Sequence, residues 1–277
     1  MNVVGVGKTG CAIAKELSEY PQYNVYYVDA QNQKKYENFS KVKEQDSHEA
    51  YENNYRKIVF KNLPVSPTIV IFSGAGKIAG LVLRLLEQLK EHDLTVLYIK
   101  PDISLLSEDS VVRERIVSGI LQQYARSSLL KNMCIVSNEQ VERVLENVSI
   151  ADYWRDINAT IASTFHMLNV FDNTEPLLST MSNPKETSKI STMGVVSYKS
   201  LDEKIFYELQ KPRLKKYFFG ISEKTLEREK DLLNKIRSYV KSKSEEKCVA
   251  CFAIYSTDYD QDYVYVSQYA SFIQEEH

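Results

Sequence analysis

Six of the nine glycines in this chain of 277 residues lie in two short segments, residues 5–10 and 74–80. Each segment follows an apolar run typical of a β-strand and precedes a run typical of a helix. Where a strand turns directly into a helix, free N–H groups and the positive end of the helix dipole attract anions such as phosphate. Two such junctions, about 70 residues apart, therefore predict a nucleotide held from two sides.

Apolar runs alternate with helical periods along the first half of the chain. Strands that are joined through helices by short connections form a parallel sheet with helices on both faces. Between the second and third strands, residues 31–56 are polar and are predicted to be a surface connection. The predicted strands are residues 2–6, 24–28, 68–72, 94–99 and 133–136, and the predicted helices lie near 11–20, 80–92, 109–130 and 138–147.

A long helix is predicted next, and a smaller α/β unit follows it. The helix has apolar residues at spacings of three and four, which is typical of one buried face. That predicted stripe consists of Ile150, Trp154, Ile157, Ile161, Phe165 and Leu168. In the smaller unit the predicted strands are 193–198, 214–220, 248–255 and 263–267, with helices near 200–209 and 222–240.

Composition and charge exclude several classes of function. The net charge is −2 and the pI is about 6.2, so the charge does not indicate contact with nucleic acid or an anionic membrane. No apolar run approaches the roughly 18 residues that span a bilayer. The cysteines at 11, 134, 248 and 251 lack a second Cys or His pair for zinc and are predicted to be reduced, partly buried thiols. These features predict a cytoplasmic protein.

The first glycine segment also fits the dinucleotide-binding fingerprint Gly-x-Gly-x-x-Gly. Asp29 ends the next predicted strand about 20 residues later, where an acidic side chain binds a ribose in dinucleotide-binding folds. This interpretation predicts an NAD-dependent oxidoreductase, but it accounts for only about 30 residues. A P-loop is excluded, because its first glycine would fall on Asn2.

A longer set of segments, over residues 1–181, resembles the tubulin/FtsZ superfamily. In that family the second strand ends in Asp-Ala-Gln, a glycine-rich loop follows the third strand, and the next strand ends in Lys-Pro. The corresponding segments here are Asp29-Ala30-Gln31, 68–80, 94–101, 134–138, 150–158 and 169–175. The resemblance implies a Rossmann-like parallel-sheet nucleotide-binding domain over residues 1–149, a central helix over 150–171 and a smaller C-terminal α/β domain over 172–277.

The resemblance further implies that the two glycine segments hold the phosphates of GTP or GDP. Their alternative role is purely structural, as tight turns that let strand and helix pack closely. The residues concerned are Gly5, Gly7 and Gly10 in the first segment, and Gly74, Ala75, Gly76, Lys77 and Gly80 in the second.

The second segment departs from the family pattern Gly-Gly-Gly-Thr-Gly-Ser/Thr-Gly. Lys77 replaces the threonine, which removes a hydroxyl but adds a cation that a phosphate can meet. Ile78 replaces a glycine and Ala79 replaces a hydroxyl residue. A β-branched side chain resists a positive φ and crowds an approaching phosphate. Residues 41–56 contain no glycine, so the family's loop over the γ-phosphate has no counterpart there.

The guanine base has its own candidate residues. The resemblance implies that Trp154 stacks on the base and that Asn158, one helical turn later, hydrogen-bonds its edge. Asp29 and Asn138 are the candidates to line the base or the ribose. The alternative places Trp154 in the core and Asn158 on the helix surface.

Residues 169–175 resemble the family's acidic loop, which projects into the nucleotide pocket of the next subunit. Asp172 and Glu175 are the catalytic candidates, because paired acids there polarise the attacking water and help to place Mg²⁺. One residue is inserted relative to the family between Asn169 and Asp172. The alternative is a helix start, with Asn173 or Thr174 as the N-cap and Glu175 in the first turn.

These features together predict a divergent tubulin/FtsZ-like protein that binds guanine nucleotide and assembles head to tail. GTP hydrolysis would be completed across the subunit contact. A second hypothesis is a non-hydrolysing structural or regulatory partner of the same fold, motivated by the altered second segment. The NAD-dependent oxidoreductase remains the third. Self-association into head-to-tail filaments is the predicted partnership, and an FtsZ/tubulin-like or adaptor partner of unknown identity is left open.

Overall fold

The computed structural model describes residues 1–31, 36–145 and 149–275. The chain forms two compact units, Met1–Ser163 and Thr164–His277, and the division falls inside helix α6 (Tyr153–Asp172). Among the described residues, no helix combines the length and the apolar character needed to cross a membrane.

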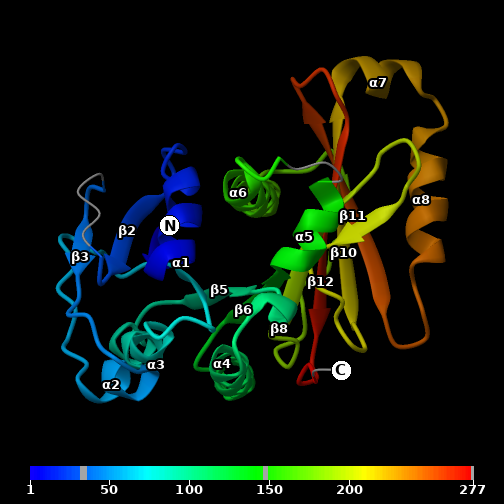
Figure 1. The fold of residues 1–277 in the computed structure, drawn as a ribbon. Helices are drawn as coiled ribbons and strands as arrows, with labels where there is room; N and C mark the ends of the chain where they lie inside the picture. The colour runs from blue at the N-terminus through cyan, green and yellow to red at the C-terminus, as the bar shows by residue number, and fades with distance from the viewer. Residues whose placement is uncertain (32–35, 146–148, 276–277) are drawn as a thin grey trace. The chain divides into compact units, whose positions relative to one another are not determined.

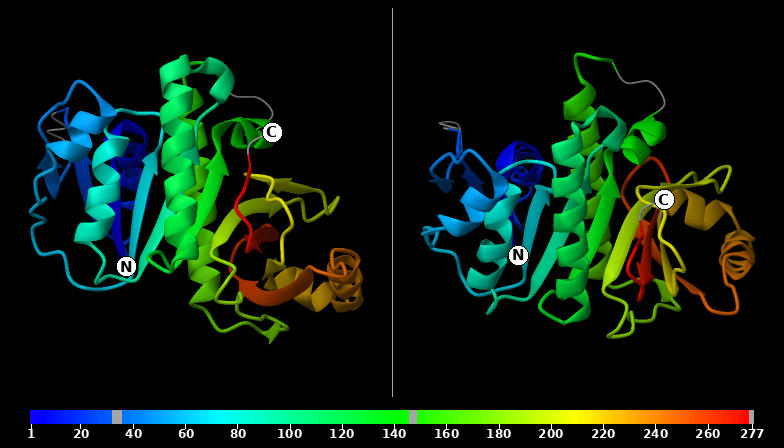
Figure 2. Two further views of the ribbon diagram at one scale, coloured as in Figure 1. Left: turned by 90° about the horizontal axis from the view of Figure 1, so that it is seen from below. Right: turned by 60° about the horizontal axis from the view of Figure 1, so that its bottom comes forward.

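The first unit contains a parallel sheet with strand order β3-β2-β1-β4-β5-β6. Its central strands are rich in Val, Ile and aromatic residues and are buried along nearly their whole length, as expected for a sheet covered on both faces. Figure 2 shows these strands side by side. Their bounds are β1 (Asn2–Val6), β2 (Asn24–Asp29), β3 (Phe39–Lys41), β4 (Thr68–Ser73), β5 (Leu94–Lys100) and β6 (Asn132–Ser137).

Helices cover both faces of this sheet. Helix α1 lies on one face, and α3 and α4 lie on the other (Figure 1). This arrangement follows from right-handed crossovers, because the chain moves from β1 to β2 in one direction and from β4 to β6 in the opposite direction. The bounds are α1 (Gly7–Leu17), α2 (His48–Asn53), α3 (Ala79–Gln88), the 3₁₀ turn η1 (Ile103–Leu105), α4 (Glu108–Arg126) and α5 (Asn138–Leu145).

Two glycines allow helix α1 to approach the sheet without intervening side chains. A Cβ atom on Gly10 would lie 2.0 Å from the carbonyl oxygen of Ile71 in β4. A Cβ on Gly5 would lie 2.5 Å from the carbonyl oxygen of Gly10. The packing role predicted as the alternative for these glycines is therefore present.

The second unit contains a mixed sheet with strand order β9-β8-β12-β10-β11-β7. Strands β10 and β11 are parallel and are connected through α7 and α8, while the other pairs are antiparallel. The bounds are β7 (Leu178–Ser179), β8 (Ile190–Val196), β9 (Glu203–Ile205), β10 (Leu214–Ser222), α7 (Glu223–Arg228), α8 (Leu232–Ser242), β11 (Val249–Thr257) and β12 (Tyr263–Ala270).

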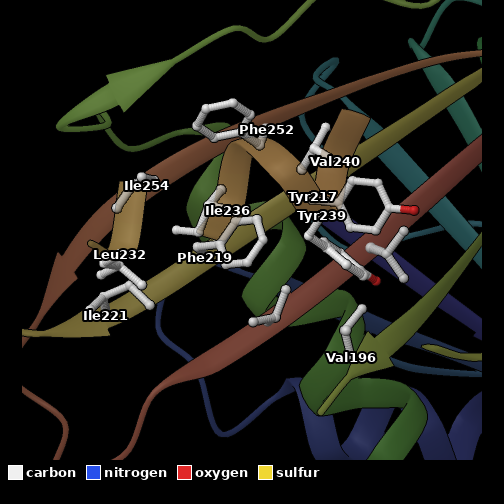
Figure 3. Packing of buried hydrophobic residues seen from close by; sticks show 12 residues of the cluster. Val196, Tyr217, Phe219, Ile221, Leu232, Ile236, Tyr239, Val240, Phe252 and Ile254 are labelled. Atoms are coloured by element: carbon white, nitrogen blue, oxygen red, sulfur yellow. The ribbon is translucent and has the colours of Figure 1, made fainter. Parts of the chain in front are cut away.

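The core of the second unit lies between α8 and this sheet (Figure 3). Ile236 and Tyr239 from α8 pack against alternate residues of β10, which include Tyr217 and Phe219. Alternate residues of a strand share one face, so this face of β10 is apolar from Tyr217 to Ile221. The rings of Tyr217 and Tyr239 meet edge to face, with centroids 5.4 Å apart.

The helix predicted near residues 200–209 is wrong, because this segment contains strand β9, paired with β8. Leu201 has φ of 59°, and the N–H of Ser197 donates to the carbonyl of Asp202 at 3.0 Å. This tight turn reverses the chain before β9, so residues 200–209 do not form a continuous helix. The single helix predicted over 222–240 is two helices, α7 and α8.

The predicted buried stripe of the long helix is correct in its middle and wrong at its start. Ile157 and Ile161 are fully buried, whereas Ile150 is 97% exposed and lies before α6 begins. Trp154 is 57% exposed, so the alternative that places it in the core is wrong. Helical spacing identifies a shared face, but the neighbouring elements decide how far along the helix that face is covered.

We expect a Gly10→Ala substitution to lower the free energy of unfolding by about 1–3 kcal/mol, because the new methyl group overlaps the β4 backbone. Gly119 in α4 is the matched control, because nothing lies within 4 Å of a Cβ built there. Gly119→Ala should leave stability unchanged or raise it by up to about 1 kcal/mol. Urea unfolding of both variants measures the difference, and equal effects would contradict the close contact between α1 and β4.

All four cysteines are buried and free of disulfides, as predicted. Burial, and then the charge of Asp29, raise the pKa of Cys11 to about 12. We therefore expect Cys11 to stay a thiol up to about pH 10, so its alkylation in the folded protein should not accelerate between pH 7 and 10. Mass spectrometry after iodoacetamide treatment measures this, with the urea-unfolded chain as the reactive control. Rapid native labelling of Cys11 at pH 9 would contradict the packing.

Candidate functional site

The two glycine segments, Asp29 and Asn138 lie at the carboxyl ends of parallel strands in the first unit. Because these strands are parallel, their carboxyl ends share one edge of the sheet. The chain reverses its direction across the sheet between β1 and β4. Ligands of open α/β sheets bind at such a switch point, outside the carboxyl ends of the strands.

The first glycine segment connects β1 to α1 with no intervening loop. Gly7, the first residue of α1, is buried and has φ of 68°, a conformation that favours glycine. Within the described chain, no side chain caps this helix and no acidic residue lies in its first turn. The start of α1 therefore keeps the backbone N–H groups and the positive dipole that suit an anion.

The second glycine segment connects β4 to α3 through residues 74–78. Two of its glycines are required by packing: a Cβ on Gly74 would lie 2.1 Å from the Tyr98 hydroxyl, and one on Gly80 would lie 2.0 Å from the His48 carbonyl oxygen. Gly76 and Lys77, by contrast, are exposed. Only the middle of this segment is thus open to a ligand.

Ile78 joins the two glycine segments. Its Cγ2 atom lies 2.9 Å from the position of a Cβ on Gly7 and 3.8 Å from one on Gly76. The two strand–helix junctions therefore lie next to each other at the switch point, as predicted from the sequence. The isoleucine that replaces a glycine of the family pattern occupies part of the space between them.

Sequence reasoning missed a basic residue at the second junction. The Nε of Arg113, in α4, donates to the Ala75 carbonyl at 3.1 Å, and its Nη2 donates to Ser110 Oγ at 2.7 Å. A second group at this junction is His48, whose backbone carbonyl lies against Gly80. Burial of the His48 ring lowers its pKa. No local motif marks Arg113, because it comes from a helix about 40 residues away in sequence.

Asp29 and Asn138 both lie buried at the carboxyl edge. Asp29 Oδ1 accepts a hydrogen bond from the N–H of Ala30 at 2.8 Å. Asn138 is the first residue of α5, directly after β6. Its Oδ1 is buried without a hydrogen-bond partner in the described part of the chain. Buried polar atoms are rarely left unpaired, so Asn138 is suited to accept a hydrogen bond from a ligand.

Trp154 and Asn158 lie on the first turns of α6 but differ in burial. The Trp154 ring is exposed and packs edge to face on Tyr153, with centroids 5.0 Å apart. The Tyr153 hydroxyl donates to Glu142 Oε2 in α5 at 2.8 Å. Asn158 is 9% exposed, so its predicted alternative as a helix-surface residue is wrong.

The acidic pair lies in the second unit. Asp172 is the last residue of α6, and Glu175 lies in the exposed connection to β7. The alternative of a helix start is wrong. Asn173 Nδ2 and Thr174 Oγ1 donate, each at 2.8 Å, to backbone carbonyls of the preceding turn, so they close the end of α6.

Asp172 forms an ion pair with Lys216 of β10. Lys216 Nζ donates to Asp172 Oδ1 at 2.8 Å. The Lys216 side chain is only 9% exposed, whereas that of Asp172 is 46% exposed. The ammonium group also lies 5.2 Å from the centre of the Phe218 ring. A buried cation needs a partner, so this pair fixes the position of the Asp172 carboxylate.

In the residues that the structure describes, no group of three or more His, Cys, Asp or Glu side chains is arranged to hold a metal ion.

Neither a protein-family model nor a curated protein matches the amino-acid sequence. Solved structures do match. A GTPγS-form protofilament of TubZ from Bacillus thuringiensis serovar israelensis is 12% identical, with 97% of this chain and 86% of that chain covered and a TM-score of 0.65. An empty dimer of FtsZ from M. jannaschii is 8% identical, with 97% of this chain and 87% of that chain covered and a TM-score of 0.68.

A third match is CetZ2 from Haloferax volcanii, as a GTPγS-bound protofilament. It is 12% identical, with 97% of this chain and 92% of that chain covered and a TM-score of 0.69. Matches over nearly the whole length of both chains confirm the predicted Rossmann-like α/β fold. The chain therefore has the fold of the tubulin/FtsZ superfamily.

Proposed function

We propose that this protein binds a guanine nucleotide at the β1/β4 switch point and assembles head to tail into filaments. One observation carries the proposal: two uncapped strand–helix junctions rich in glycine lie next to each other there, joined by the Ile78–Gly7 contact. The similar TubZ and CetZ2 structures are protofilaments with GTPγS, which supports the same ligand class and self-association here.

The phosphates would be held by the starts of α1 and α3. Backbone N–H groups at the start of α1 and in residues 76–78, which precede α3, would donate to phosphate oxygens, and the helix dipoles would stabilise the negative charge. Lys8 and Lys77 are exposed at these two starts and would supply point charges. Arg113 would act through Ala75, since it holds the backbone of the second segment.

The guanosine would be held by polar and aromatic groups of the first unit. The unpaired Asn138 Oδ1 fits a ligand N–H or O–H donor. Asp29 is the candidate for the ribose, and the exposed Trp154 ring is available for stacking on the base. Asn158 is the candidate for the base edge.

Hydrolysis would need the acidic pair of a second subunit. In head-to-tail assembly, one surface of each subunit binds a different surface of the next subunit. Each end of the assembly therefore keeps an unoccupied surface, and the subunits form filaments. Asp172 and Glu175 of one copy would then orient the water that attacks the γ-phosphate bound to the next copy. The Lys216 ion pair would hold the Asp172 side chain in position.

We expect GTP to bind the purified protein and the Lys77→Gln variant to bind it about tenfold more weakly, which corresponds to about 1.4 kcal/mol. The reason is the loss of one phosphate-binding cation. Lys90→Gln is the matched control, because Lys90 is also exposed but follows the far end of α3. Isothermal titration calorimetry measures both variants. Equal binding by all three proteins, or no uptake of GTP, would contradict the proposed phosphate site.

We expect Asp172→Asn to abolish phosphate release and to lower the free energy of unfolding by about 1–3 kcal/mol, because Lys216 loses its charged partner. The double variant Asp172→Asn/Lys216→Met should recover stability, since an uncharged pair leaves no buried charge, but not activity. Malachite-green phosphate assays, pelleting and urea unfolding measure these effects. Recovery of phosphate release in the double variant would show that Asp172 acts only through stability.

A second candidate function is a non-hydrolysing structural or regulatory partner of the same fold. The contact between Ile78 and Gly7 favours it, because this side chain occupies space at the predicted phosphate site. Wild-type protein that forms filaments, but releases no more phosphate than Asp172→Asn, would select this second function.

A further inference from the structure

A groove in the first unit is lined by residues outside the two glycine segments and has no role in the proposed function. It lies between residues 39–45, which contain β3, and residues 53–59, which begin at the last residue of α2, and Leu81 of α3 also contributes to its lining. Its volume is about 950 Å³. We propose that this groove binds a small polyphosphate anion, either free or as part of a nucleotide.

The groove is closed at both ends by hydrogen bonds between its walls. At one end Ser40 Oγ donates to the Val59 carbonyl at 3.3 Å. At the other end Asn54 Nδ2 donates to Gln45 Oε1 at 3.1 Å. An extended peptide or nucleic-acid strand would have to break these bonds to pass through. A compact ligand fits between them, and the volume is in the range of small-molecule sites.

One wall is held in place by helix α3. The Gln88 side chain accepts a hydrogen bond from the Ile58 N–H at 2.9 Å and donates to the Ile58 carbonyl at 2.8 Å. It also accepts a hydrogen bond from the Tyr55 hydroxyl. A surface connection that is anchored in this way keeps its shape, so the cations it carries are positioned before a ligand arrives.

The charged side chains that line the groove are all basic, although Glu44, between lining residues 43 and 45, adds one negative charge beside it. Its lining residues include four cations and no Asp or Glu. All four are exposed, and among the described residues none of them takes part in an ion pair. Glu52, next to the groove in α2, is already paired with Arg84 at 3.3 Å. The four cations are Lys41 and Lys43 on one wall, and Arg56 and Lys57 on the other.

Cations on facing walls select a ligand with several negative charges. Arg56 can bind two phosphate oxygens with its planar guanidinium group, and the lysines act as point charges. A single carboxylate would neutralise only one cation. A di- or triphosphate carries several negative charges, which is comparable to the positive charge of the four lining cations. Asn53 and Asn54 add amide groups that can hydrogen-bond either phosphate or an attached nucleoside.

The test is calorimetric titration of inorganic tripolyphosphate into the full-length protein at low ionic strength, with GDP present in excess. We expect binding that is at least about tenfold weaker in Lys43→Gln/Arg56→Gln, which removes one cation from each wall. Lys90→Gln/Lys230→Gln is the matched control, with two exposed cations removed from outside the groove and the glycine segments, and should bind like the wild type. Lys8→Gln/Lys77→Gln tests the glycine segments separately. Circular dichroism verifies that all three double variants are folded.

The outcomes separate this site from the proposed function. Tripolyphosphate binding that is lost in Lys8→Gln/Lys77→Gln but retained in Lys43→Gln/Arg56→Gln would overturn the groove and support the glycine segments alone. No binding to the wild type at millimolar tripolyphosphate would also overturn it. Tighter binding of ATP than of tripolyphosphate, with the same dependence on Lys43 and Arg56, would identify a nucleotide as the source of the polyphosphate.

Discussion

The direct contact between helix α1 and strand β4 is the constraint on which the arrangement of the first unit depends. It exists because Gly10 places the helix backbone against the carbonyl of Ile71, where even a methyl group would not fit. This contact brings the start of α1 next to the segment that follows β4. The two strand–helix junctions then meet at the switch point of the sheet, where a phosphate can be reached from both.

The close packing of the helices and strands also affects how the glycines can be interpreted. Several glycines of the two segments are needed for packing. Gly5 and Gly10 lie where α1 meets the sheet, Gly74 lies against Tyr98, and Gly80 lies against His48. Their presence alone is therefore weak evidence for a ligand. The stronger evidence is the absence of a side-chain cap at the described start of α1, together with the exposure of Gly76 and Lys77 before α3. Ile78 is evidence against a ligand at this position, because its side chain fills space beside Gly7.

Charge is organised locally within each unit, although the whole chain is almost neutral. In the second unit a nearly buried lysine, Lys216, forms an ion pair with Asp172. A change at this candidate catalytic group is therefore also expected to lower the stability of the protein. In the first unit, unpaired cations face one another across the groove beside β3. A net charge of −2 gives no sign of either feature, because net charge sums over positions that are far apart in the fold.

The sequence by itself determined the parallel strands of the first unit, the two glycine junctions and the order of motifs that resembles the tubulin/FtsZ superfamily. These depend on local periodicity and on backbone requirements of glycine, which are visible in short windows. Only the tertiary structure decided that residues 203–205 pair as a strand, that Trp154 is exposed, that Arg113 supports the second segment and that Asp172 meets Lys216. Each of these depends on groups brought together from distant parts of the chain, where packing and pairing override local propensity.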